Sequence, residues 1–296
     1  MAIHGGAGSV TRSNTSAQQE KDYINGLNEA LNAGYNMLAN GGTAMDAVER
    51  SVMALEDIPL FNAGRGSVFT SEGRHEMDAA VMCGKTLRAG AVSAVSNIKN
   101  PIRLARTVME KSENVLLTGS GAIEFAKKHE IPFEEDSYYF TEKRQQELLH
   151  AKEQSNERNT GKGTVGAVAM DTFGNLAVAT STGGLTNKKY GRVGDSPVIG
   201  GGTYANNHTC AVSCTGDGEY LIRLVAAYDI SCYMEYKQLG LQEACMALIN
   251  KLTALGGEGG LIAIDQHGQV QQVFNCESML RAWKNHHGEG ETKIWQ

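Results

Sequence analysis

The sequence is poor in proline, in tryptophan and in positive charge. Its 296 residues include only 4 prolines and 2 tryptophans, and Lys and Arg together number 27 against 33 Asp and Glu. The resulting net charge of −6 argues against a nucleic-acid-binding protein, which usually presents a basic face. So few prolines beside 35 glycines exclude a low-complexity chain rich in both residues, and a hydrophobic content of 41% is enough for a folded core.

Signals for membrane insertion, secretion and metal binding are also missing. No apolar run reaches the length of a membrane-spanning helix, and the first residues, Met-Ala-Ile-His-Gly-Gly, do not resemble a signal peptide. The sequence contains no HExxH motif and no CxxC pair, and its six cysteines suit buried, reduced thiols. We therefore expect a cytoplasmic protein that has no catalytic metal and that binds neither membrane nor nucleic acid.

The order of the predicted elements favours two antiparallel sheets covered by helices. After a short strand at residues 3–8, the early elements are mostly helices, predicted over residues 16–38, 43–55, 101–110 and 122–128. The later elements include two hairpins, which join 165–171 to 175–182 and 260–265 to 270–274, a strand at 210–215, and helices over 219–234 and 241–252. Because hairpins imply antiparallel pairing, we expect an α+β fold, a four-layer αββα sandwich, rather than a doubly wound parallel sheet.

The composition changes abruptly at Thr164. Residues 142–163 are mostly charged and polar, which predicts a solvated, mobile linker, and a strand begins directly after it. If the chain is cut there, the threonine becomes an N-terminal residue whose α-amino group, with a pKa of about 7.7–8.0, can take the proton of its own hydroxyl. Such a residue is nucleophile and base at once. Position alone favours the alternative, an ordinary threonine at the start of a strand.

Two further segments could assist such a nucleophile. Thr182 ends the strand that is predicted to pair with the one after Thr164, so its hydroxyl could reach the Thr164 hydroxyl. Thr215 and Gly216 stand at a strand-to-helix turn, where a hydroxyl and backbone N–H groups can form an oxyanion hole. Capping and turn roles are the alternative for these residues.

The long loop over residues 183–207 contains a candidate binding site for an amino-acid head group. The guanidinium of Arg192 could bind a carboxylate through two hydrogen bonds, and the carboxylate of Asp195 could accept from an ammonium group. The alternative is an ion pair between these two residues at the surface. Asn62, in a separate glycine-containing loop, has a turn role as its default interpretation.

A nucleotide-binding interpretation has weaker support. Residues 161–166 match GxGxxG, but a dinucleotide site needs a strand before the motif and a helix after it, whereas here a polar linker precedes and a strand follows. Residues 119–121 have the right context, but Glu124 occupies the third glycine position. We expect neither segment to bind a nucleotide.

Taken together, these residues resemble the plant-type L-asparaginase/isoaspartyl peptidase family of N-terminal-nucleophile hydrolases. The resemblance is strongest in three motifs, Gly163-Thr-Val-Gly-Ala-Val168, Ala179-Thr-Ser-Thr-Gly-Gly184 and Gly191-Arg-Val-Gly-Asp-Ser-Pro197. It extends over nearly the whole chain through the segments Ile3–Gly8, Leu60–Gly64, Met77–Ala79, Gly90–Ser93, Asn100–Ile102 and Ser213–Glu219.

The resemblance implies an αββα fold and a precursor that cleaves itself between Gly163 and Thr164. The products would be an α subunit (1–163) and a β subunit (164–296), which stay associated as an (αβ)₂ dimer. Thr164 would act as nucleophile and base, with Thr182 as its hydrogen-bonding helper. The implied reaction is hydrolysis of L-asparagine and of β-aspartyl dipeptides, without a cofactor for catalysis.

The resemblance also assigns the remaining site residues. Thr215 and Gly216 would form the oxyanion hole, with Asn62 assisting nearby. The residues implied to bind the substrate are Arg192, Val193, Gly194, Asp195, Thr215, Gly216, Asp217 and Gly218. A structural sodium or potassium ion would be held by the backbone carbonyls of Leu55, Glu56, Ile58, Phe61, Ala63 and Arg65.

Three other functions remain as alternatives. A glycosylasparaginase would share fold and mechanism, although its nucleophile usually follows an aspartate, whereas Gly163 precedes Thr164 here. An uncleaved amino-acid-binding protein would stay a single chain. A nucleotide-dependent oxidoreductase would depend on residues 161–166 alone and would bind NAD.

Overall fold

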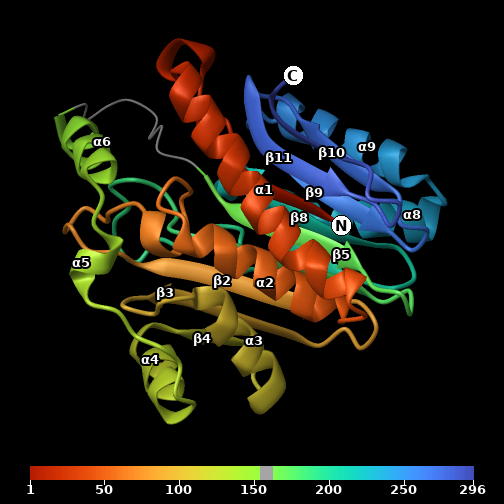
Figure 1. Cartoon of the computed structure of the whole chain (residues 1–296), viewed down its shortest axis with the longest axis horizontal. Coiled ribbons are helices and arrows are strands. Elements are labelled where there is room, and N and C mark those ends of the chain that lie inside the picture. Colours follow the sequence, from red (N-terminus) through yellow and green to blue (C-terminus); the bar gives the residue numbers. More distant parts are fainter. Residues whose placement is uncertain (154–162) are drawn as a thin grey trace.

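The computed structural model describes residues 1–153 and 163–296, which form two β-sheets flanked by helices (Figure 1). The larger sheet has the strand order β12-β11-β1-β5-β6-β2-β3-β4 and the smaller one the order β10-β9-β8-β7. The strands of the larger sheet are β1 (Ala2–Ala7), β2 (Met77–Cys83), β3 (Ala89–Val95), β4 (Leu116–Thr118), β5 (Val165–Met170), β6 (Leu176–Thr182), β11 (Ser278–Lys284) and β12 (Gly290–Trp295). Those of the smaller sheet are β7 (Thr203–Ala205), β8 (Cys210–Gly216), β9 (Gly259–Asp265) and β10 (Val270–Phe274).

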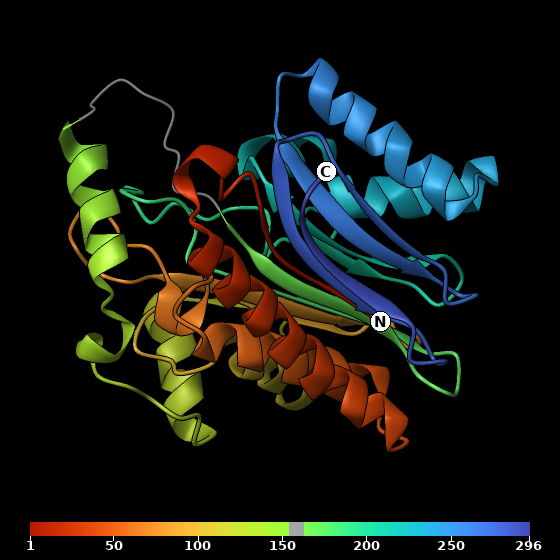
Figure 2. The ribbon, with the colours of Figure 1, turned by 45° about the horizontal axis from the view of Figure 1, so that its top comes forward.

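The two sheets pack against each other and helices cover their outer faces (Figure 2). The molecule has nine α-helices within the described residues. Their bounds are α1 (Ala17–Ala39), α2 (Ala44–Asp57), α3 (Pro101–Lys111), α4 (Gly119–Lys128), α5 (Asp136–Tyr139), α6 (Glu142–Glu153), α7 (Gly218–Leu224), α8 (Ala226–Lys237) and α9 (Leu241–Ala254). Helices α5 and α6 lie to one side of this sandwich (Figure 2). Helices α2 and α3 contact the larger sheet, and α8 and α9 contact the smaller one. The prediction of two sheets covered by helices is therefore confirmed.

Local sequence signals explain where several elements begin. Capping boxes at Ser16 and Thr43 satisfy the first N–H groups of α1 and α2. Strands β5 and β6 are rich in Ala, Val and other small or β-branched residues and are buried along almost their whole length, because the second sheet covers one face and α2 the other. Both predicted hairpins are confirmed by antiparallel pairing of β5 with β6 and of β9 with β10.

Two predictions of local structure are wrong. The solvated linker predicted from residue 142 is helical up to Glu153, because Arg144 and Leu148 are buried on one side of α6 and the Arg144 side chain donates to the Gly66 carbonyl. The rest of that linker, 154–162, lies outside the described residues. The helix predicted over 219–234 is two helices, since Val225 adopts a left-handed conformation (φ 50°, ψ 49°) between α7 and α8.

Two further findings concern the membrane and the cysteines. Within 1–153 and 163–296, no helix is both long and apolar enough to cross a bilayer. All six cysteines lie in these ranges and are free thiols, four of them buried and Cys83 and Cys232 partly exposed.

Candidate functional site

The Gly163–Thr164 peptide bond lies at the open end of the β5–β6 hairpin, opposite its turn. Val165 pairs with Ser181 in this hairpin, which brings Thr164 opposite Thr182. The Thr164 hydroxyl donates to Thr182 Oγ1 over 3.2 Å, and the Thr182 hydroxyl donates to the Gly163 carbonyl over 3.0 Å. A chain of two hydrogen bonds thus connects the hydroxyl of Thr164 to the carbonyl oxygen of the bond that precedes it.

Asn62 approaches the same carbonyl from the loop after α2. Its Nδ2 donates to the Gly163 carbonyl over 2.9 Å and to the Gly184 carbonyl over 2.8 Å, while its Oδ1 accepts from the backbone N–H of Val68. The Gly184 N–H in turn donates to Thr182 Oγ1. Because Asn62 is buried and all of its polar atoms are engaged, the donor at Gly163 is held rigidly.

The backbone at Gly163 requires glycine. Its φ is +148°, a conformation that residues with a side chain rarely adopt, and a Cβ there would lie 3.2 Å from the Cβ of Asn62. Thr164, Thr182 and Asn62 are each at most 6% exposed, so the peptide bond sits in a largely dry environment. In such surroundings fixed hydrogen-bond donors stabilise a developing negative charge more strongly than in water.

The predicted oxyanion residues lie at the end of β8, in the other sheet. Thr215 Oγ1 accepts from the Ala7 N–H over 3.2 Å, so that its own proton is left to donate. Gly216 has a φ of +135° and passes so close to β9 that a Cβ would lie 2.4 Å from the Glu258 carbonyl oxygen. The site is therefore assembled from both sheets, where one end each of β1, β5, β6 and β8 come together.

A small pocket separates the threonines from the loop that contains the predicted head-group residues. Its lining residues are Gly163, Thr164, Thr182, Gly184, Leu185, Arg192, Gly194, Asp195, Ser196 and Gly216. Of the residues predicted to act on substrate, Asn62, Val193, Thr215, Asp217 and Gly218 do not line it. Asn62 lies behind Gly163, and Asp217 Oδ2 accepts from the Glu258 N–H.

Arg192 and Asp195 do not form the surface ion pair that was the alternative for them. Arg192 instead pairs with Glu219 through two hydrogen bonds. Asp195 is buried, and among the described residues its Oδ2 has no hydrogen-bond partner. Burial raises the pKa of Asp195 to about 7, and the positive charge of Arg192 works against that rise. A buried carboxylate with an open oxygen is suited to receive a cation.

A buried acid on β2 and a buried base within this loop lie close to the site. Asp78 pairs with Thr182 across β2 and β6, and its Oδ1 accepts from the Ala94 N–H over 2.8 Å. Lys188 donates to the Glu76 carbonyl. Burial raises the pKa of Asp78 and lowers that of Lys188, and each charge partly offsets the shift of the other. Residue-by-residue reasoning missed both residues and Glu219, although Asp78 and Glu219 stand in segments that carry the family resemblance.

Beneath the nucleophile, a chain of buried hydrogen bonds joins the two sheets. His4 Nε2 lies 2.9 Å from Ser213 Oγ, which lies 2.7 Å from Thr180 Oγ1. Burial lowers the pKa of His4 to about 3, so the imidazole is neutral near pH 7. Because His4 pairs with Gly166 on the neighbouring strand, this chain fixes the start of β5, where Thr164 stands.

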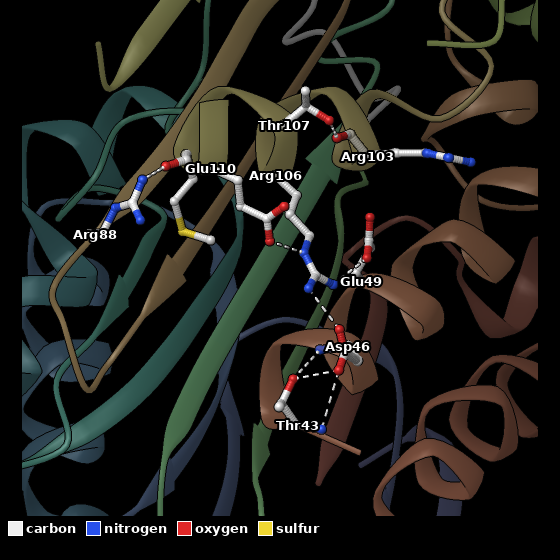
Figure 3. Close-up of polar contacts among 9 residues, drawn as sticks. Thr43, Asp46, Glu49, Arg88, Arg103, Arg106, Thr107 and Glu110 are labelled. Atoms are coloured by element: carbon white, nitrogen blue, oxygen red, sulfur yellow. Dashed lines mark hydrogen bonds and ion pairs between the residues drawn. The ribbon is translucent and has the colours of Figure 1, made fainter. Parts of the chain in front are cut away.

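A second polar cluster lies between α2 and α3 (Figure 3). The three guanidinium nitrogens of Arg106 contact one carboxylate each, from Asp46, Glu49 and Glu110. Thr43 hydrogen-bonds Asp46 at the start of α2. Three of the five N–H donors of Arg106 are thus directed to carboxylates, and the residue joins α2 to α3. In the described part of the chain, no group of three or more His, Cys, Asp or Glu side chains is arranged to hold a metal ion.

Comparison with known proteins agrees with the motifs in the site. A family profile described as asparaginase matches residues 1–294. An isoaspartyl peptidase of Salmonella typhimurium is 50% identical over 294 residues, covering 96% of this chain and 94% of the relative. The isoaspartyl peptidase of Escherichia coli is also 50% identical, covering 96% and 92%. An isoaspartyl peptidase/L-asparaginase of Xenopus laevis is 44% identical over 282 residues, covering 94% and 90%.

Proposed function

The chain belongs to the asparaginase family, and on this premise we propose that it hydrolyses the β-carbonyl amide bond of β-aspartyl dipeptides and of L-asparagine after cleavage between Gly163 and Thr164. One observation carries the proposal beyond the comparisons. The hydroxyl of Thr164 is hydrogen-bonded, through Thr182, to the carbonyl that it must attack, next to a pocket that holds an arginine and an open carboxylate.

In the cleavage step, Thr164 Oγ1 attacks the Gly163 carbonyl carbon. Its proton passes toward Thr182, and the negative charge that grows on the Gly163 oxygen is stabilised by the donors of Asn62 and Thr182. The C–N bond then breaks, its nitrogen takes up a proton, and an ester joins Gly163 to Thr164. Water hydrolyses this ester, which yields the Gly163 carboxylate and a free N-terminal Thr164.

In the mature enzyme, the new α-amino group takes over the role of base. With a pKa of about 7.7–8.0 it is partly unprotonated near pH 7 and accepts the proton of the Thr164 hydroxyl. Thr164 attacks the β-carbonyl of the substrate, while the Thr215 hydroxyl and a backbone N–H at Gly216 stabilise the oxyanion. The amine leaves with a proton, and water then releases aspartate from the acyl-enzyme.

The charges around the pocket support a substrate that is gripped by its α-carboxylate and α-ammonium groups. If Arg192 and Asp195 bind these two groups, the side-chain carbonyl is the carbon presented to Thr164. Ammonia leaves from L-asparagine, and a whole amino acid leaves from a β-aspartyl dipeptide. An α-linked peptide lacks the free α-carboxylate, and glutamine places its carbonyl more than 1 Å away, a displacement that can cost about 100-fold in rate.

The larger organisation follows from the same family membership. We infer the fold of N-terminal-nucleophile hydrolases, α and β subunits of residues 1–163 and 164–296, and an (αβ)₂ dimer. The six free thiols support a location in the reducing cytoplasm. Catalysis uses no cofactor in this scheme, since nucleophile, base and oxyanion donors all come from the chain.

The loop after α2 fits a sodium or potassium ion in a structural role. The carbonyls of Ile58, Phe61 and Ala63 each accept one backbone hydrogen bond, which leaves a lone pair on each for a hard cation. A Cβ on Gly64 would lie 2.5 Å from the Glu56 carbonyl oxygen, so glycine lets the loop fold tightly around that oxygen. The ion would also use the carbonyls of Leu55 and Arg65, and it would fix the loop that presents Asn62.

A substrate panel tests the proposal. The purified protein should hydrolyse β-Asp-Leu and L-asparagine, with the dipeptide favoured, and should leave α-Asp-Leu and L-glutamine near background. Equal rates for α- and β-Asp-Leu would overturn the assigned roles of Arg192 and Asp195. Preference for a glycosylated asparagine would favour the glycosylasparaginase alternative, and a single stable chain that binds amino acids without turnover would favour the binding protein.

A further inference from the structure

Arg192 has two edges that can each bind a carboxylate, and one of them is already occupied. Nε donates to Glu219 Oε1 over 2.8 Å and Nη2 donates to Glu219 Oε2 over 2.9 Å. A guanidinium has five N–H donors in a fixed plane. The pair with Glu219 uses the Nε side and one hydrogen of Nη2, so the edge formed by Nη1 and the second hydrogen of Nη2 can still take another carboxylate.

The remaining edge of Arg192 faces three glycines beside the pocket. Nη1 lies 2.9 Å from the point where a Cβ of Gly194 would stand and 3.6 Å from that of Gly184, and both glycines line the pocket. Nη2 lies 2.8 Å from the corresponding point at Gly218, and Asp195 Oδ1 lies 2.9 Å from the same point. The edge opposite Glu219 is therefore directed to the space that Asp195 also borders, and no side chain of these glycines fills it.

The two partners differ in exposure. The Arg192 side chain is 18% exposed, whereas that of Glu219 is 56% exposed. A flexible arginine on a loop loses side-chain entropy whenever it is held in one orientation. The pair with Glu219 meets that cost before any ligand arrives, and so pre-organises the inner edge.

We propose that Glu219 is a positioning residue, which holds the outer edge of Arg192 so that its inner edge is aimed at the α-carboxylate of the substrate. This inference rests on the proposed function, since it assumes that Arg192 binds that carboxylate. Glu219 itself does not touch the reacting atoms. The opposite role, a carboxylate that competes with substrate for the same donors, predicts effects of the opposite sign.

The test compares Glu219→Ala and Glu219→Gln with the wild type, using β-Asp-Leu as substrate. Loss of the pair should raise KM about tenfold, below the roughly 100-fold cost of a 1 Å misplacement, and leave kcat within about twofold. Gln keeps one acceptor and should fall between. Glu291→Ala is the matched control, because it removes a similarly exposed carboxylate, 49% exposed, from an ion pair with Lys293 on β12.

Two further readouts separate positioning from a general structural effect. In an Arg192→Ala background, Glu219→Ala should not raise KM further, because the group that it positions is gone. A β-aspartyl peptide whose aspartyl α-carboxylate is amidated should be hydrolysed equally slowly by wild type and Glu219→Ala. Unchanged or lower KM in Glu219→Ala would overturn the inference, whereas failure of the wild type to hydrolyse β-Asp-Leu would overturn the proposed function instead.

Discussion

The two sides of the pocket differ in how completely their polar groups are paired. Around Gly163, the hydroxyls of Thr164 and Thr182 and the amide of Asn62 form a closed set of hydrogen bonds. Across the pocket, Asp195 is buried, and Oδ2 has no hydrogen-bond partner within residues 1–153 and 163–296. In the proposed scheme, the first side already contains its substrate, which is the chain itself, whereas the second side receives a charged group from outside.

This difference is what the proposed scheme requires of one pocket that serves two reactions in sequence. Cleavage is intramolecular, so its donors can be fixed when the chain folds. Hydrolysis of an external substrate needs a recognition side that is unsatisfied until that substrate binds. Changes on the cleavage side should therefore affect maturation, and changes on the recognition side should affect KM and kcat/KM while leaving maturation intact.

Thr164→Ala should have the largest effect, because it removes the proposed nucleophile of both reactions. We expect a single chain of 296 residues without hydrolase activity, as measured by intact mass and by β-Asp-Leu turnover. Thr164→Ser is the control, since it keeps a hydroxyl and should still cleave, more slowly. Cleavage of pure Thr164→Ala at 163/164 would show that cleavage does not need this residue.

Arg192→Ala should have the next largest effect, and it should affect hydrolysis of the external substrate but not self-cleavage. Loss of the bidentate partner of a buried carboxylate costs about 2–5 kcal/mol, which corresponds to roughly a 30- to 5,000-fold loss in kcat/KM. Cleavage at Thr164 should proceed at the wild-type rate. Arg192→Lys keeps the charge but not the fork, and it should recover part of the loss. An unchanged kcat/KM would show that the substrate does not use this guanidinium.

Asn62→Ala should slow self-cleavage, because Asn62 belongs to the cleavage side of the pocket. Removal of one oxyanion donor costs about 100- to 1,000-fold in rate, so the half-time of self-cleavage should lengthen by that factor. The substitution also removes the hydrogen bond that the Val68 N–H donates to Asn62 Oδ1. Thermal unfolding of the variant measures the loss of stability that this causes. Normal cleavage kinetics in a folded variant would remove Asn62 from the maturation step.

The pH dependence of KM should give the smallest effect. Because burial raises the pKa of Asp195 to about 7 in the free protein, this group loses its charge as the pH falls through 7. KM should then rise, approaching tenfold per pH unit below pH 7, as the negative partner of the ammonium disappears. In Asp195→Asn this slope should vanish, and a KM that still rises in the same way would have to be assigned to another group.

The raised pKa of Asp195 also makes the stability of the fold depend on pH. The folded state holds the proton of Asp195 more tightly than the unfolded state, whose pKa is near 3.8. This group therefore favours folding below that unfolded value, and its contribution is lost as the pH rises through the folded pKa near 7. The buried, ionised carboxylate of Asp195 thus lowers the stability of the fold at neutral pH. A bound ammonium group would restore that stability.

The sequence was informative where one segment determines its own structure. The hairpin of 165–171 with 175–182 is confirmed, and its register alone places Thr182 beside Thr164, which makes that contact predictable from pattern. The helix over 142–153 escaped prediction because only Arg144 and Leu148 anchor it, and a buried arginine looks polar in the sequence. The break at Val225 was missed because a β-branched residue is an unusual choice for a left-handed conformation.

Contacts between distant segments could not be predicted in this way. Arg192 was expected to pair with Asp195, three residues away, or with substrate, but the fold brings Glu219 to it from another element. The same holds for Asp78, whose place beside Thr182 follows from the pairing of β2 with β6. Strand β2 was itself not predicted, so no pattern in the sequence could place its aspartate. The roles of these residues in binding and catalysis remain predictions.

The most direct test of the account follows cleavage and activity in one sample. Freshly purified protein is incubated, and intact mass, the N-terminal sequence of each fragment and β-Asp-Leu hydrolysis are measured over time. The account predicts fragments of residues 1–163 and 164–296, with activity that rises in proportion to the fraction that begins with Thr164. Full activity of the uncleaved chain, or cleavage at another bond with activity intact, would contradict it.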